Sequence, residues 1–123
     1  MDEYKEDRTA VIYLLLKEVG IPAHLRGYDF VFYAIECAID NPERPMTGKN
    51  GMYADIAQKY GSTATRVERA IRVASEYMCL HSDIDDLRRV FGNTLPCDKD
   101  KPINRTLIYQ LAKETEMRLK KVV

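Results

Sequence analysis

The stretch from Asp55 to Ala74, DIAQKYGSTATRVERAIRVA, constrains the fold more than any other part of this 123-residue chain. A short apolar pattern at Ile56 and Ala57 is broken at residues 60–62, and a longer pattern with helical spacing opens at Thr63. The apolar positions of that longer pattern are Val67, Ala70, Ile71, Ala74 and Met78. Two helices joined by a tight turn that contains glycine are typical of a helix-turn-helix, which we place at about residues 52–79.

The second of these two helices carries a polar face opposite its apolar stripe. An arginine fork matches the O6 and N7 atoms of guanine, and a carboxylate can accept from the amino group of cytosine. The pattern therefore predicts a helix that enters the major groove of double-stranded DNA. An equally simple alternative is a solvated face with an ion pair between Glu68 and Arg72, and spacing alone leaves it open. The polar positions are Thr65, Arg69, Arg72 and Glu76, with Arg66 and Glu68 on the flanks.

The residues of the turn suit both a tight connection and a phosphate contact. Gly61 can adopt a left-handed backbone conformation at little cost. Thr63 is a candidate N-cap, but Thr65 and Glu68 also form a capping box, so the start of the helix is ambiguous by two residues. Ser62, Thr63 and the free N–H groups at the start of the helix are suited to DNA phosphates.

The rest of the chain shows helical patterns only. Apolar spacing predicts further helices at residues 8–19, from about Leu25 or Tyr28 to Asp40, and at residues 84–91 and 107–120. Asp83 and Asn104 are candidate N-caps of the last two. No segment alternates with a period of two for long enough to form a strand. We therefore predict an all-α fold of about six helices in a single domain that spans residues 1–123.

The charges of the chain balance overall but not locally. There are 19 basic and 19 acidic residues, which argues against indiscriminate coating of nucleic acid. Between Lys59 and Arg72, however, there are four basic residues and one acid, Glu68. The compensating acids lie near the N-terminus and at Asp83, Asp85 and Asp86. A segregated basic face of this kind suits a specific DNA reader.

Several other classes of protein are disfavoured. The three cysteines have no CxxC spacing and the two histidines are isolated, so we expect neither a metal nor a cofactor. Cys37 and Cys79 lie in helical patterns and are expected to be buried small hydrophobes. No catalytic motif such as GxSxG, HExxH or a P-loop appears, so we do not expect an enzyme. No apolar run approaches the ~20 residues of a membrane span, and the charged N-terminus is unlike a signal peptide, so we expect a cytoplasmic protein.

Four segments, in order, carry a resemblance to a known family. They are GIPAHLRGY (20–28) together with AIECAI (34–39), YADIAQKYGSTATRVERAIR (53–72), VFGNT (90–94) and KPINRTLI (101–108). With these segments the chain resembles the C-terminal effector domain of the sporulation-initiation response regulator, the master transcription factor of endospore-forming bacteria. The match runs from about Leu15 onward, and TATRVERAIR is its most specific part.

The resemblance implies a six-helix fold that binds a short DNA box, often with two domains in tandem on one duplex. It also implies that segment 84–91 corresponds to a region that the family uses with RNA polymerase. The positions of this motif that contact DNA in the family fall here on Thr65, Arg66, Glu68 and Arg69, and the neighbours expected near phosphates are Arg72 and Lys59.

The chain also departs from the family pattern. The family regulator carries an N-terminal receiver domain with a phosphoacceptor aspartate, and this sequence has no room for one. We expect an excised effector domain or a free-standing protein, and the Met1 start favours the latter. Val73 stands where the family commonly has histidine, and Gly61 where it often has asparagine. Segment 84–91 is more charged here than in the family.

Two functions remain in competition at this point. The first is a sequence-specific DNA-binding transcription regulator that lacks a receiver domain and is controlled in another way. The alternative is a protein-interaction module or antagonist that keeps the fold without specific DNA binding, for which the zero net charge is the motivation.

Overall fold

The computed structural model describes residues 2–98 and 103–121, and these ranges contain six α-helices, one short 3₁₀ helix and no strand. The all-α prediction is confirmed. The first and last helices both begin earlier than predicted. For the first helix the reason is that residues 2–7 are mostly charged and carry no apolar pattern that could reveal a helix. The helices are α1 (Asp2–Val19), α2 (Arg26–Asp40), α3 (Met52–Tyr60), α4 (Ala64–His81), α5 (Ile84–Phe91) and α6 (Asn104–Lys121), with η1 (Pro96–Asp98) before α6.

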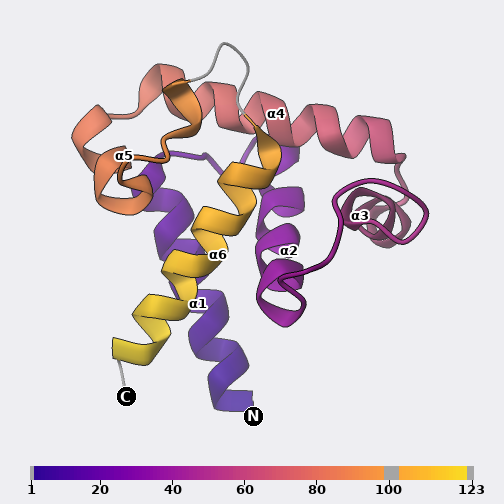
Figure 1. Cartoon of the computed structure of the whole chain (residues 1–123), viewed down its shortest axis with the longest axis horizontal. Helices are drawn as coiled ribbons and strands as arrows, with labels where there is room; N and C mark the ends of the chain where they lie inside the picture. Colours follow the sequence, from indigo (N-terminus) through magenta and orange to yellow (C-terminus); the bar gives the residue numbers. More distant parts are fainter. Residues whose placement is uncertain (1, 99–102, 122–123) are drawn as a thin grey trace.

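Helix α4 lies across one end of the other long helices. Figure 1 shows α1, α2 and α6 running roughly alongside one another, with α4 crossing above them and α3 and α5 near its opposite ends. The packing of α4 against α2, α3 and α6 follows the same arrangement. One side of α4 is therefore held by the rest of the domain, and the other side faces outward.

A single hydrophobic core joins the long helices. Leu15 of α1, Ile35 of α2, Ile71 of α4 and Leu111 of α6 are each completely buried within it. Burying one such side chain contributes about 1.5–3 kcal/mol relative to leaving it in water. The apolar stripe predicted for α4 points into this core, which fixes the rotation of α4 about its own axis.

Helices α2 and α4 come unusually close at Gly27. A Cβ atom at this position would lie 2.2 Å from the carbonyl oxygen of Ala70 and 3.2 Å from the Cβ of Ala74. Gly27 is buried and lies in the first turn of α2. The absence of a side chain therefore allows the start of α2 to pack directly against the middle of α4.

A polar cluster around Asp55 holds α3 against α2 and the loop before it. Arg44 Nη1 donates to Asp55 Oδ2 at 2.9 Å, and the hydroxyl of Tyr33 donates to the same oxygen at 3.4 Å. Burial, followed by the neighbouring Cys37 and Asp55, raises the pKa of Tyr33 to about 12. Tyr33 is therefore protonated at neutral pH and keeps its hydrogen available for this contact.

The prediction for the cysteines is right for Cys37 and wrong for Cys79. Cys37 is a buried free thiol, as expected. Cys79 is only half-buried and forms a disulfide with Cys97, with the two Cα atoms 5.5 Å apart. This bond ties the end of α4 to η1. Spacing could not reveal it, because the chain between them contains a turn, α5 and a loop whose return path is set by tertiary packing.

Two further absences concern the described residues alone. Within residues 2–98 and 103–121, no group of three potential histidine, cysteine or carboxylate ligands is arranged to hold a metal ion. None of the helices in these ranges is both long and apolar enough to cross a lipid bilayer.

Candidate nucleic-acid interface

The turn between α3 and α4 consists of residues 61–63 and depends on Gly61. Gly61 has φ 63° and ψ 41°, a left-handed conformation, and its N–H donates to the carbonyl of Ala57. The N–H of Ser62 donates to the same carbonyl at 2.8 Å, which is the 6→1 bond typical of a Schellman ending. A Cβ at Gly61 would meet no atom within 4 Å, so glycine is favoured here by the backbone conformation and not by lack of space.

Thr63 caps the start of α4. Its Oγ1 accepts from the backbone N–H of Arg66 at 3.2 Å, and its backbone is extended, with φ −122° and ψ 154°. Helix α4 therefore begins at Ala64, and the capping box that starts at Thr65 is not formed. The first backbone N–H groups of α4 have no carbonyl partner within the helix, as at every helix start.

The two helices have the relation expected of a helix-turn-helix. In Figure 1 α3 is seen nearly end-on, whereas α4 lies across the view, so their axes cross steeply. Helices α3 and α4 pack against each other, and Ala57 of α3 and Val67 of α4 are both buried.

The outward face of α4 gathers three of the predicted residues. Thr65, Arg66 and Arg69 are all exposed, within the first two turns of the helix. Among the residues described, no carboxylate lies within ion-pair distance of Arg66 or Arg69. Neither guanidinium group is thus occupied by a carboxylate of the described residues.

Glu68 and Arg72, in contrast, are paired with each other. Arg72 Nη2 lies 2.5 Å from Glu68 Oε1, and each side chain is 40% exposed. This is the ion pair of the solvated-face alternative. A pair of this kind, four residues apart on a helix surface, contributes about 0.3–0.5 kcal/mol. It can therefore open at small cost when a stronger partner for either group arrives.

Lys59 lies apart from the outward face of α4. Its ammonium group is 4.2 Å from the ring centroid of Tyr33, which places it over the side of α3 that faces α2. Ser62 is half-buried in the turn. The structure thus brings Thr65, Arg66 and Arg69 together, with Ser62 and Thr63 at the start of the same helix, and does not bring Lys59 to them.

Asn104 joins α6 to both helices of the helix-turn-helix. Its side-chain amide donates to the hydroxyl of Tyr53 at 3.1 Å and to the backbone carbonyl of Glu68 at 3.0 Å. Asn104 is the first residue of α6, so the prediction that it is the N-cap is wrong. The predicted N-cap of α5 is confirmed, because Asp83 accepts from the N–H of Asp85 at 2.8 Å. The two contacts of Asn104 span 36 and 51 residues of sequence, and no local pattern could have indicated them.

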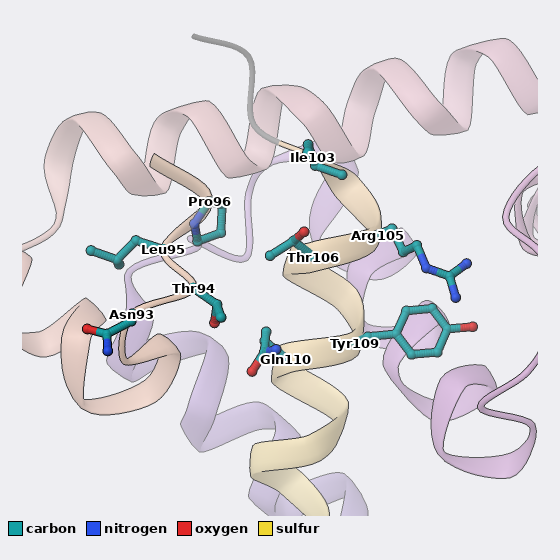
Figure 2. A pocket seen from close by; sticks show the side chains of 9 residues that line it. All are labelled: Asn93, Thr94, Leu95, Pro96, Ile103, Arg105, Thr106, Tyr109 and Gln110. Carbon is teal, nitrogen blue, oxygen red and sulfur yellow. The ribbon is translucent and has the colours of Figure 1, made fainter. Parts of the chain in front are cut away.

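A separate recess of about 510 Å³ lies between segment 93–96 and α6. Figure 2 shows Leu95 and Pro96 on one side of this recess and Tyr109 on the far side of α6, with Arg105 extending beside it. Among the described residues, its lining contains no acid, histidine or cysteine.

A three-residue turn with a left-handed glycine, followed by a helix with free arginines at its start, defines a helix-turn-helix of the DNA-binding class. Comparison of the sequence with known protein families makes the assignment more specific. Residues 12–115 match the family described as sporulation initiation factor Spo0A, C-terminal, and the chain belongs to that family, a family of DNA-binding transcription regulators of sporulation. The resemblance seen in the sequence is thereby confirmed.

Proposed function

We propose that this chain, working as a single domain in the cytoplasm, is a sequence-specific DNA-binding transcription regulator that inserts α4 into the major groove. The observation that carries this proposal is the group formed by Thr65, Arg66 and Arg69, which is exposed and has no carboxylate partner for either arginine among the described residues. An α-helix with its side chains is about 10–12 Å across and fits a groove about 12 Å wide.

Each side chain of the group then has a role set by its chemistry. Arg66 and Arg69 would donate to guanine O6 and N7, and Thr65 would contact a base edge or a phosphate beside them. Glu68 would accept from a cytosine amino group once its pair with Arg72 opens, and the released Arg72 would bind a phosphate. Because an exposed ion pair costs little to break, Glu68 and Arg72 can exchange each other for DNA groups, and both can then bind DNA.

The phosphate contacts at the turn are less uniform. Ser62, Thr63 and the free N–H groups of the first turn of α4 would bind one phosphate together. Lys59 would reach a phosphate only by leaving the ring of Tyr33, and an exposed cation–π contact is worth about 0.5–1 kcal/mol. We therefore propose Lys59 as a contact at the margin of the interface.

The proposal is tested by selecting bound duplexes from a random DNA pool at 0.15 M salt, with the wild-type chain and with Arg69→Ala. The wild type is expected to enrich one short motif. Arg69→Ala is expected to bind that motif more weakly by ~1–3 kcal/mol and to tolerate any base at one position. Arg88→Ala, a change at an exposed arginine of α5, serves as the control. Equal affinity of Arg69→Ala and wild type for the motif would contradict the base-reading role.

A protein partner is the second candidate, and the junction of α4 and α5 favours it. Leu80 is 80% exposed and Ile84 is 47% exposed, so two apolar side chains face solvent close together in the chain. The family resemblance makes RNA polymerase the expected partner of segment 84–91. If the wild type enriched no duplex but bound a protein partner, and Leu80→Ser with Ile84→Ser abolished that binding, the chain would be an interaction module or antagonist instead.

A further inference from the structure

The outward face of α4 has two flanks, and the first turn of another helix adjoins each of them. On the flank of Arg66, the contact between Gly27 and Ala70 places the start of α2 against α4. On the opposite flank, the bond from Asn104 to the carbonyl of Glu68 places the start of α6 against α4. Figure 1 shows that both helices begin at α4 and run away from it toward the same end of the molecule. Each of the two starts carries an arginine.

Arg26 stands at the start of α2. It lines a recess of about 610 Å³ together with His24, Ser62 and Arg66. The same recess contains one carboxylate, Asp29, but no ion pair joins it to either arginine within the described ranges. Arg26 and His24 are exposed. The positive charge of Arg66 therefore continues from α4 onto the segment that leads into α2.

Arg105 stands in the equivalent place at the start of α6. It lines a recess of about 550 Å³ with Glu68, Arg72 and Asn104. Its guanidinium lies 4.8 Å from the ring centroid of Tyr109, and Figure 2 shows the two side chains next to each other on α6. Glu68 is already paired with Arg72, and Arg105 has no ion-pair partner in the part of the chain that is described.

We infer that Arg26 and Arg105 bind DNA phosphates on opposite walls of the major groove, one on each side of α4. The inference rests on the proposed function, because it takes α4 as the helix in the groove. Helices packed on α4 lie about 8–10 Å from its axis, and this distance puts their first turns over the walls of a groove about 12 Å wide. The walls carry the phosphates, and contacts to phosphate fix the register and orientation of a protein on the duplex. Two such contacts would stop α4 from rolling about its axis in the groove.

The salt dependence of binding tests the two contacts. Each phosphate neutralised by an arginine adds about 0.9 to the slope of log affinity against log salt concentration on duplex DNA. Arg26→Ala and Arg105→Ala are each expected to lower the slope by about 0.9, which corresponds to roughly eightfold weaker binding at 0.1 M salt. The double variant should lower the slope by about twice as much. The loss should be equal on the selected motif and on a 30-base-pair duplex of random sequence, because phosphates carry no base identity.

Arg88→Ala is the matched control, because Arg88 is an exposed arginine on α5 that lines neither of the two recesses. A circular dichroism spectrum and melting temperature equal to those of the wild type establish that each variant is folded. If the salt-dependence slope of Arg26→Ala or Arg105→Ala equals that of Arg88→Ala, the inference that both arginines bind phosphates on either side of α4 is wrong.

Phosphate ethylation interference locates the contacts on the selected duplex. Arg26→Ala and Arg105→Ala should each abolish interference at a different set of phosphates, with the two sets on opposite sides of the groove. Loss of the same set in both variants would overturn the inference even if both slopes fall. A failure of the proposed function looks different, since the wild type itself would then enrich no motif.

Discussion

At the scale of single residues, Gly27 decides how closely α2 and α4 can pack. Because a Cβ there would meet a backbone carbonyl at 2.2 Å, the obstacle cannot rotate away as a side chain would. The two helices would have to separate. The absence of a side chain at Gly27 therefore sets how the start of α2 packs against α4. It thereby also sets the position of Arg26.

Gly27→Ala is accordingly expected to destabilise the chain despite the higher helix propensity of alanine. Overpacking of this kind costs about 1–3 kcal/mol, which a urea unfolding curve measures directly. Arg26→Ala, at the exposed neighbouring position, should change the free energy of unfolding by less than about 0.5 kcal/mol. A Gly27→Ala variant as stable as Arg26→Ala would show that the helices can part without cost.

At the scale of elements, the cap and the turn define where the helix-turn-helix begins and ends. Thr63→Ala removes the acceptor for the N–H of Arg66 and should cost about 1 kcal/mol in unfolding free energy. Thr63→Ser keeps the hydroxyl and should be close to wild type. Thr65→Ala tests the rejected cap and should change stability by less than about 0.5 kcal/mol. If Thr65→Ala cost more than Thr63→Ala, α4 would begin two residues later in solution.

The elements that could be predicted from sequence are those with a local signal. The apolar period of α4 gave its buried stripe, and Gly61 and Thr63 gave the turn and a candidate cap, because each of these depends on neighbours within four residues. The start of α1 was missed because its first turns are mostly charged. The bridge from Asn104 to Tyr53 could not be predicted, because it joins residues that only the folded chain brings together.

The candidate site divides in the same way. Exposure of Thr65, Arg66 and Arg69 follows from helical geometry and was predictable. The position of Lys59 over Tyr33 was not, since it depends on how α3 packs on α2. The roles of all these residues on DNA remain predictions.

At the scale of the whole molecule, the disulfide between Cys79 and Cys97 closes a loop around α5. The two residues are 18 apart in sequence, and cross-linking a loop of about 15 residues is worth about 3 kcal/mol in the chain-entropy account. Reduction with a thiol should therefore lower the free energy of unfolding by an amount of that order. The double variant Cys79→Ser with Cys97→Ser should match the reduced protein and show no response to the reductant.

Thiol labelling provides an independent check of the same bond. Burial raises the pKa of the Cys37 thiol, so at pH 8 even less of it is thiolate than in an ordinary cysteine. The folded, unreduced chain should therefore react with iodoacetamide very slowly. Once unfolded without reductant it should take up one label, and after reduction three, as counted by mass spectrometry. Rapid uptake of two labels by the folded, unreduced chain would contradict the disulfide.

The family resemblance implies tandem binding, and the intact chain would then place two copies of the domain on adjacent boxes of one duplex. Gel-shift stoichiometry on duplexes with one and two selected motifs would measure this directly. Such pairing leaves α6 of each copy anchored to its own helix-turn-helix through Asn104.

Asn104 therefore links α6 mechanically to the helix whose outward face we propose for DNA. A displacement of the first turn of α6 must either break the hydrogen bonds that the side-chain amide of Asn104 donates or move the backbone at Glu68 with it. If α4 binds in the major groove as proposed, a partner that binds α6 at a distance from the duplex, a neighbouring copy included, would tilt α4 in that groove. Control of binding would then need no contact with a single base or phosphate.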